Sequence, residues 1–160
     1  MPGDDRQRAL AFSRQLRQVH DQLQEQLTGL RAEPGQSETS DLLRHCLAFC
    51  SALSEHHSAE DGGLFGALLA ARPDLAPAIG KLTDDHAAIA AILARVRELT
   101  AQARTAPAED LAALRRELDG LAAIAESHFR YEERALSAAL DDAAPAAGWP
   151  PAAFGSVDYQ

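Results

Sequence analysis

The sequence predicts an all-α fold, an up-down-up-down antiparallel four-helix bundle with an irregular C-terminal tail. Apolar residues recur every three to four positions along most of the 160 residues, which is the spacing of amphipathic helices. Alanine, the strongest helix former, occurs 34 times, whereas aromatic residues, which favour strands, make up only 5%. Three proline-containing breaks divide the pattern into four long segments, and such segments with short connections form a four-helix bundle.

The first two helices are predicted at residues 6–31 and 41–71. Glu33-Pro34-Gly35 ends the first helix, and residues 37–40 provide N-cap candidates for the second. The apolar face of the first helix consists of Phe12, Leu16, Val19, Leu23, Leu27 and Leu30, and that of the second of Leu42, Cys46, Phe49, Cys50, Leu53, Leu64 and Leu68.

The third and fourth helices are predicted at residues 75–103 and 108–140, after breaks at 72–74 and 105–107. Their apolar faces consist of Leu75, Ile79, Leu82, Ile89, Leu93 and Val96, and of Leu111, Leu114, Leu118, Leu121, Ala125, Ala135 and Ala139. We expect residues 1–140 to form one domain. Residues 141–160, rich in alanine and proline, are predicted to form the tail.

Composition excludes several classes of partner. The formal net charge of −9 argues against a nucleic-acid or anionic-membrane binder, which needs basic patches. No apolar run reaches the roughly 18–20 residues that a membrane span requires. The N-terminal residues lack the basic and apolar regions of a signal peptide, so we expect a cytoplasmic protein. Cys46 and Cys50 lie one turn apart on an apolar face, and we interpret them as small buried hydrophobic residues.

Each predicted helix carries a histidine on or beside its apolar face, namely His20, His56, His86 and His128. His56 and His128 each precede a glutamate, Glu60 or Glu132, by four positions, which places each pair on one helix face. At about 1.5 Å per residue, the candidates on the second, third and fourth helices lie at similar heights. The first connection fits less well, because His20 lies about 17 Å from the end of its helix and His56 about 23 Å into the next.

A metal explains why carboxylates lie on the buried side of the helices. An unpaired carboxylate in an apolar core is costly, and a bound cation removes that cost. Imidazole and carboxylate ligands suit iron, manganese or zinc. About six such ligands exceed what one tetrahedral zinc needs. The pattern therefore favours two ions that share bridging carboxylates, with iron preferred over manganese or zinc.

The combination of His20, His56-x-x-x-Glu60, His86 and His128-x-x-x-Glu132 resembles the hemerythrin-like, HHE cation-binding family. The string His56-His57-Ser58-Ala59-Glu60-Asp61, followed by Leu64-Phe65, is similar to the family's helix-two signature. The resemblance covers about residues 6–140. It implies a four-helix bundle that holds two iron ions joined by an oxo or hydroxo bridge, with the four histidines and two glutamates as metal ligands. Members of the family bind dioxygen or nitric oxide, sense iron or oxygen, or carry out oxidative chemistry.

One ligand of the oxygen-carrying hemerythrins is missing here. Their third helix has two histidines one turn apart, whereas the residues four positions from His86 are Leu82 and Ala90. Fewer histidines leave more open metal positions, which favours activation of dioxygen or peroxide for the oxidation of a small molecule. An oxygen-, nitric oxide- or iron-binding or sensing protein without turnover is the alternative.

Several residues leave alternatives open. His57 forms its own i,i+4 pair with Asp61 and is a reserve ligand in place of His56. Glu133 is the reserve for Glu132, because it has the fourth-helix spacing of the oxygen carriers. Tyr131, next to the helix-four ligands, is either a redox-active catalytic phenol or an interfacial tyrosine.

His45 lies about 16 Å along the helix from His56, too far to share the centre. Gly62, Gly63 and Gly66 are unexpected inside a helix, where each costs about 1 kcal/mol relative to alanine. We interpret these glycines as permitting a bend or the close approach of another surface, such as a second subunit in a homodimer.

Overall fold

The computed structural model describes residues 2–32, 39–105 and 107–143, with side chains at 12–32, 41–105 and 109–142. The chain forms α1 (Pro2–Arg31), α2 (Thr39–Ala59), α3 (Phe65–Ala71), α4 (Ala76–Gln102) and α5 (Pro107–Ala143). A π-helical turn at Glu60–Leu64 joins α2 to α3, and a short 3₁₀ turn at Pro73–Leu75 leads into α4. The described residues contain no strand.

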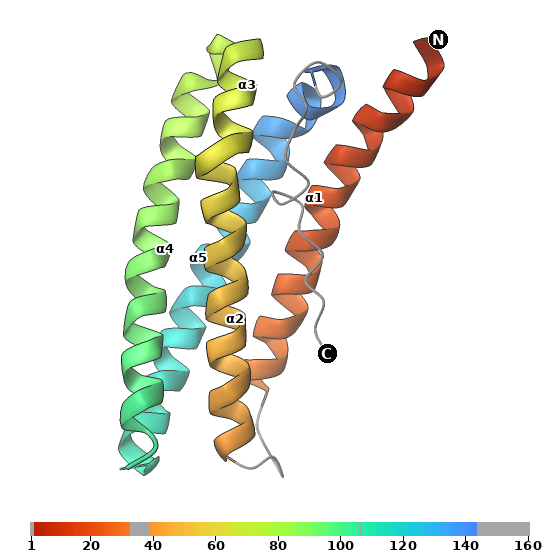
Figure 1. Ribbon diagram of the computed structural model, residues 1–160. Helices are drawn as coiled ribbons and strands as arrows, with labels where there is room; N and C mark the ends of the chain where they lie inside the picture. Colours follow the sequence, from red (N-terminus) through yellow and green to blue (C-terminus); the bar gives the residue numbers. More distant parts are fainter. Residues whose placement is uncertain (1, 33–38, 106, 144–160) are drawn as a thin grey trace.

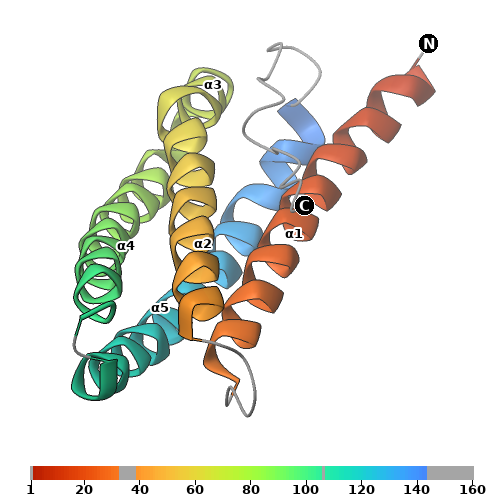
Figure 2. The same ribbon diagram turned by 60° about the horizontal axis from the view of Figure 1, so that its bottom comes forward.

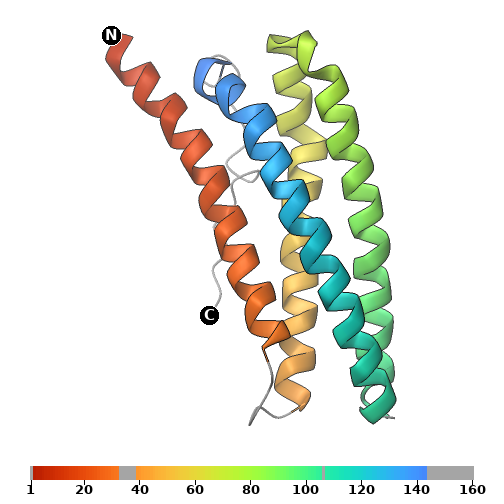
Figure 3. The same cartoon turned by 180° about the vertical axis from the view of Figure 1, so that it is seen from behind.

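The helices form an antiparallel bundle in which successive long helices alternate in direction (Figure 1). The α2–α3 unit runs as one continuous rod through the π-helical turn, so the bundle has four long rods. α1 packs against α5 and α2, and α4 packs against α5 and α2. Seen from behind, α5 lies between α1 and α4 (Figure 3). The first turns of α1 splay away from the other helices (Figure 2). The all-α fold predicted from the sequence is therefore confirmed.

The predicted helix at 41–71 is interrupted, because the backbone widens into a π turn at residues 60–64. The fourth helix continues to Ala143, three residues beyond its predicted end at 140. The rest of the tail, with Trp149, Phe154 and Tyr159, lies outside the described residues. In the parts of the chain that the structure describes, no helix is long and apolar enough to cross a membrane.

The buried apolar residues form two clusters, one in each half of the bundle. The larger contains Val19, Leu23, Leu53, Ile89, Leu93 and Leu121, and the smaller contains Leu16, Leu64, Leu68, Leu82 and Leu136. The amphipathic periods of the four rods account for this division, since each rod contributes apolar residues to both clusters. Between the clusters, the same helix faces carry histidines and glutamates instead of apolar residues. The core is thus divided by a buried polar layer.

Some predicted core positions shift by one residue. Leu43 is buried while Leu42 is only half-buried, and Leu136 is buried while Ala135 is half-buried. In each case the larger or better-placed leucine occupies the core. Phe129 was not among the predicted apolar residues of the fourth helix, yet it is almost fully buried beside the polar layer.

Candidate metal centre

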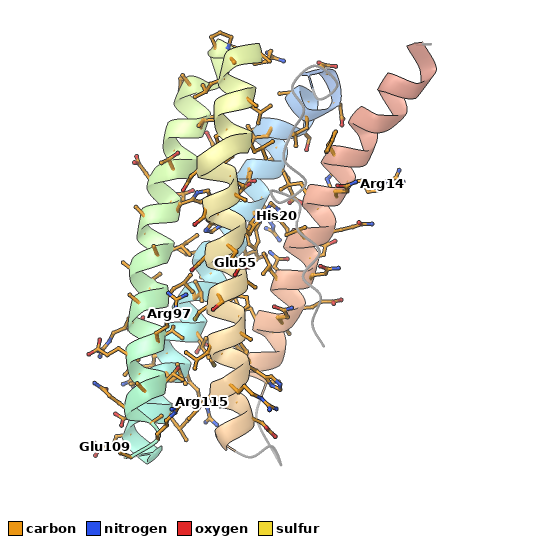
Figure 4. All side chains as sticks on the ribbon, viewed as in Figure 1. Arg14, His20, Glu55, Arg97, Glu109 and Arg115 are labelled. Atoms are coloured by element: carbon orange, nitrogen blue, oxygen red, sulfur yellow. The ribbon has the colours of Figure 1, made fainter. Side chains whose placement is uncertain are left out.

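The polar layer brings together seven side chains from all four rods. They are His20 from α1, His56 and His57 from α2, Glu60 from the π turn, His86 from α4, and His128 and Glu132 from α5. All seven are buried, and both glutamates are completely inaccessible. Figure 4 shows His20 at mid-height in the bundle interior, whereas Arg14, one turn and a half earlier on α1, projects outward. Every ligand predicted from the sequence lies in this layer, and so does the reserve residue His57.

The π turn sets the orientation of Glu60. The N–H of Phe65 donates to the carbonyl oxygen of Glu60, a bond that spans five residues rather than four. One extra residue is thereby inserted into the rod between Glu60 and Leu64. Such insertions occur frequently at functional sites. Gly62 and Gly63 lie within the turn.

One group of potential ligands consists of His20, His56, Glu60 and Glu132, whose donor atoms lie within 4.8 Å of one another. The Nε2 atoms of His20 and His56 are 3.3 Å apart. His56 Nε2 lies 3.3 Å from Glu60 Oε1, and His20 Nε2 lies 3.8 Å from Glu132 Oε1. His20 and His56 therefore lie side by side, although the sequence spacing placed them at different heights along the first two helices.

A second group consists of His57, His86 and His128, again with donor atoms within 4.8 Å of one another. The rings of His57 and His86 stack with centroids 3.9 Å apart, and the ring centroid of His128 lies 5.1 Å from that of His57. His57 from α2 thus contributes a third nitrogen beside the two from α4 and α5.

The two glutamates lie between these groups. Glu60 Oε1 is 3.3 Å from His56 Nε2 of the first group and 3.4 Å from His86 Nε2 of the second. Glu132 directs Oε1 toward His20, and its Oε2 lies 3.3 Å from His128 Nε2. Each carboxylate therefore contacts both groups, which is the arrangement that two neighbouring metal ions with bridging carboxylates require.

The donor set fits a metal. Buried nitrogen and oxygen atoms normally have hydrogen-bond partners, and orphaned ones demand an explanation. In this layer the orphaned atoms include both carboxylate oxygens of Glu60 and of Glu132, and Nε2 of His57, His86 and His128. These atoms are lone-pair donors of the kinds that bind iron, manganese and zinc. A bound cation would satisfy them together.

Without a cation, the layer is electrostatically unfavourable. Burial lowers the pKa of His56 to about 3, and it also lowers the pKa values of His57 and His86. Burial, together with the negative charge of Glu132, raises the pKa of Glu60 well above its ordinary value. For Glu132 burial acts in the same direction, but favourable interactions with nearby Glu60, His128, His20 and His56 outweigh it and lower the pKa. Without a metal, burial therefore favours the protonated form of Glu60 and the neutral forms of His56, His57 and His86.

A second set of polar residues surrounds the ligands. His86 Nδ1 lies 2.8 Å from Asp61 Oδ1, and His128 Nδ1 lies 3.1 Å from Asp85 Oδ2. Lys81 Nζ donates to the same Asp85 oxygen at 3.0 Å and lies 4.3 Å from the centre of the Tyr131 ring. A cation over the ring face interacts favourably with the neutral aromatic ring. Removal of an electron from Tyr131 is therefore disfavoured, which weakens its predicted redox role.

A surface groove of about 370 Å³ between α2 and α4 adjoins the second group. Its lining residues are Ser54, His57, Ser58, Asp61, Thr83, His86, Ala87, Ala90 and Leu93. Hydroxyls and one carboxylate line this groove, and small side chains occupy much of its α4 wall.

The remaining predictions have mixed outcomes. His45 is exposed and belongs to neither group, as expected from its distance along the helix. Glu133 lies 3.9 Å from His20 Nδ1 and is partly exposed, so the structure places Glu132 rather than Glu133 in the layer. Cys46 and Cys50 are buried free thiols in the larger apolar cluster.

Gly62 and Gly66 face open space within the described part of the chain. A Cβ added to Gly62 or Gly66 would meet no atom within 4 Å, so no neighbouring helix requires their small size. The bend and the second subunit that the glycines suggested both stay predictions.

Two residues that contact the candidate ligands were not predicted from the sequence. Asp85 has a local signal, because it directly precedes His86 and follows Lys81 by four positions. Its contact with His128 joins two helices and cannot be read from one. Phe129 stacks on His20 with ring centroids 4.1 Å apart, and its position next to His128 is the corresponding signal.

Comparison with known proteins agrees with this geometry. Neither the search of curated proteins nor the search of solved structures found a match. The sequence model of the hemerythrin HHE cation-binding domain, however, matches residues 11–147, a range that includes all seven side chains of the polar layer. Four rods that direct histidines and glutamates into one buried layer are what such a domain requires, and this chain belongs to the hemerythrin HHE cation-binding family.

Proposed function

We propose that this cytoplasmic protein holds two iron ions in the polar layer and uses them to activate dioxygen or peroxide for the oxidation of a small molecule. The observation that carries the proposal is a pair of adjacent groups of buried donor atoms joined by Glu60 and Glu132, whose carboxylate oxygens are all orphaned. Two joined groups support two ions rather than one. Seven nitrogen- and oxygen-donating side chains also exceed the four ligands of a structural zinc site.

The residues divide between two ion positions. His57, His86 and His128 would hold one ion, and His20 and His56 the other. Glu60 and Glu132 would bridge them. When bound, the iron pair supplies the electrons and the Lewis acidity for reducing dioxygen or peroxide.

The chain itself holds the ligands in position, keeps water out of the layer and provides a carboxylate that can carry a proton. The apolar clusters above and below the layer exclude water from it. Burial raises the pKa of Glu60 and so favours its protonated form in the metal-free protein, and such a proton must leave when the carboxylate binds a cation. Metal uptake is therefore coupled to proton release.

The groove between α2 and α4 supports access by a small molecule. Its hydroxyl groups on Ser54, Ser58 and Thr83 suit a polar substrate, and Asp61 disfavours an anion. A neutral or cationic hydroxylated molecule thus fits the groove better than a carboxylate or phosphate.

Turnover tests the proposal. Protein loaded anaerobically with ferrous iron is mixed with oxygen or hydrogen peroxide in the presence of a reducing phenol or another small donor, and oxidant consumption is followed. We expect many equivalents of oxidant to be consumed per chain, and Glu60→Ala, which removes a bridging carboxylate, to abolish the consumption. Consumption of one equivalent or less by the iron-loaded protein would contradict turnover.

One observation favours the alternative, binding or sensing of oxygen, nitric oxide or iron without turnover. His57 supplies a fifth nitrogen in the layer, so the count of histidines equals that expected of an oxygen carrier. The argument for extra open metal positions is thereby weakened. Release of intact oxygen from the loaded protein under vacuum, with recovery of the ferrous spectrum, would support this alternative over oxidation.

A further inference from the structure

The outer nitrogens of the histidines differ between the two groups. In the second group, Nδ1 of His86 and Nδ1 of His128 each contact a carboxylate, at 2.8 Å and 3.1 Å. In the first group, Nδ1 of His20 and Nδ1 of His56 are buried without a hydrogen-bond partner among the described residues. The carboxylate nearest to His20 Nδ1, that of Glu133, is 3.9 Å away and too distant for a hydrogen bond.

Asp85 is itself held in place. Its Oδ2 atom accepts from Lys81 Nζ at 3.0 Å as well as from His128 Nδ1. Lys81 lies one turn before Asp85 on α4 and is the single lysine of the chain. The ammonium group of Lys81 also lies over the Tyr131 ring, and this second contact holds it in place beside Asp85. Thus α4 presents to α5 a carboxylate whose position is determined before any metal binds.

We propose that Asp85 and Asp61 are positioning residues for the histidine ligands His128 and His86, and that Lys81 fixes Asp85 for this task. A carboxylate that accepts from Nδ1–H keeps the proton on that nitrogen. The Nε2 lone pair is then left for the metal, and the ring becomes a stronger donor. The Nε2 atoms of both histidines are orphaned and point at Glu60 or Glu132, as this role requires.

This inference rests on the proposed metal centre and deepens it. Loss of an outer partner of a ligand histidine typically weakens metal binding 10–100-fold. Because both carboxylates support the His57, His86 and His128 group, that position binds its ion more tightly than the other. It is therefore filled first.

The test compares Asp85→Asn and Asp85→Ala with Asp84→Asn. Asp84 is the adjacent exposed residue on α4 and makes no hydrogen bond or ion pair among the described residues, so it controls for the loss of one negative charge. Cobalt(II) affinity is measured by its visible absorption in competition with a chelator. We expect a loss of about 10-fold for Asp85→Asn, which keeps an acceptor, and up to about 100-fold for Asp85→Ala. Asp84→Asn should change the affinity less than 2-fold.

A spectroscopic readout separates positioning from structural support. Histidine ¹⁵N chemical shifts of the metal-free protein report which ring nitrogen carries the proton. His128 should hold its proton on Nδ1 in the wild type and lose this preference in Asp85→Ala. Lys81→Met should weaken cobalt binding several-fold, and Lys81→Arg should restore it. With one equivalent of zinc, the signals of His86 and His128 should shift before those of His20 and His56.

The possible failures are distinguishable. If the wild type binds no cobalt or zinc, the metal centre itself is wrong. If the wild type binds two ions but Asp85→Ala behaves like Asp84→Asn, or if the His128 proton remains on Nδ1, the positioning role is wrong and the centre stands. Earlier shifts at His20 and His56 in the zinc titration would overturn the proposed order of filling.

Discussion

Replacing Glu60 with leucine should stabilise the metal-free protein and prevent its stabilisation by metal. Glu60 is completely buried, and neither of its carboxylate oxygens has a hydrogen-bond partner in the structure. If Glu60 were a structural residue and not a metal ligand, Glu60→Leu would destabilise the metal-free protein and leave any stabilisation by metal unchanged. Glu60→Leu therefore separates a ligand from a structural residue.

The magnitude follows from burial. Leaving a buried polar group unsatisfied costs about 1–3 kcal/mol, and leucine has no such group and adds apolar contact with its neighbours. We expect the metal-free variant to have a free energy of unfolding about 1–3 kcal/mol higher than that of the wild type. A ligand at 1,000 times its dissociation constant stabilises by about 4.1 kcal/mol, so adding metal to that excess should reverse the order of the two proteins.

The stability gained by Glu60→Leu in the metal-free protein should also depend on pH. The pKa of Glu60 is raised in the folded protein, so above its ordinary value of about 4.5 the unfolded state loses this proton while the folded state keeps it. Wild-type stability therefore falls as pH rises from 4.5 toward the raised pKa, and Glu60→Leu removes that fall. The difference between the two proteins should be larger at pH 8 than at pH 5.

Urea denaturation followed by circular dichroism, with and without saturating ferrous iron under anaerobic conditions, measures these differences. Glu55→Leu is the matched control, because Glu55 is an exposed glutamate on α2, five residues before Glu60 (labelled in Figure 4). Its effect should stay within about 0.5 kcal/mol in both conditions. The reasoning is refuted if metal-free Glu60→Leu is less stable than the wild type, or if iron stabilises both proteins equally.

Three further predictions concern other parts of the molecule. His57→Ala should weaken cobalt binding at least about 10-fold, because it removes a nitrogen of the second group, whereas His45→Ala should leave the affinity unchanged in the same titration. Cys46 and Cys50 should resist a thiol reagent at pH 8 and react only after unfolding. The reason is that burial raises the pKa of both thiols, that of Cys46 to about 12. Rapid labelling of the native protein would contradict this. Gly62→Ala should be neutral or stabilise the protein by up to about 1 kcal/mol in thermal melts, since a Cβ there meets no atom; a loss above 1 kcal/mol would show that the π turn requires glycine.

Local spacing explains which features could be predicted from the sequence. The pairs His56–Glu60 and His128–Glu132 each lie within one helix, so a regular rise and angle place them correctly. The apolar periods likewise define the four rods and their buried faces. Contacts within one helix depend on sequence separation alone.

The features that escaped prediction depend on contacts between helices or on irregular backbone. In a regular helix, only one of His56 and His57 is expected to face the centre. In the structure both do, His56 in the first group and His57 in the second. The π turn at Glu60–Leu64 arises from backbone hydrogen bonds that span five residues, which no periodicity reveals. The contact of Asp85 with His128 depends on the relative height of α4 and α5, which spacing estimates only to within a few residues.

The metal content of the purified protein tests the central claim most directly. Iron is added anaerobically to the metal-free protein, the excess is removed, and bound metal is quantified together with the visible and Mössbauer spectra before and after oxygen. The structure predicts two irons per chain in two distinguishable environments, because one group has three nitrogens and the other has two. A colourless protein that binds one zinc per chain and no iron, or a protein that binds no metal, would contradict the claim.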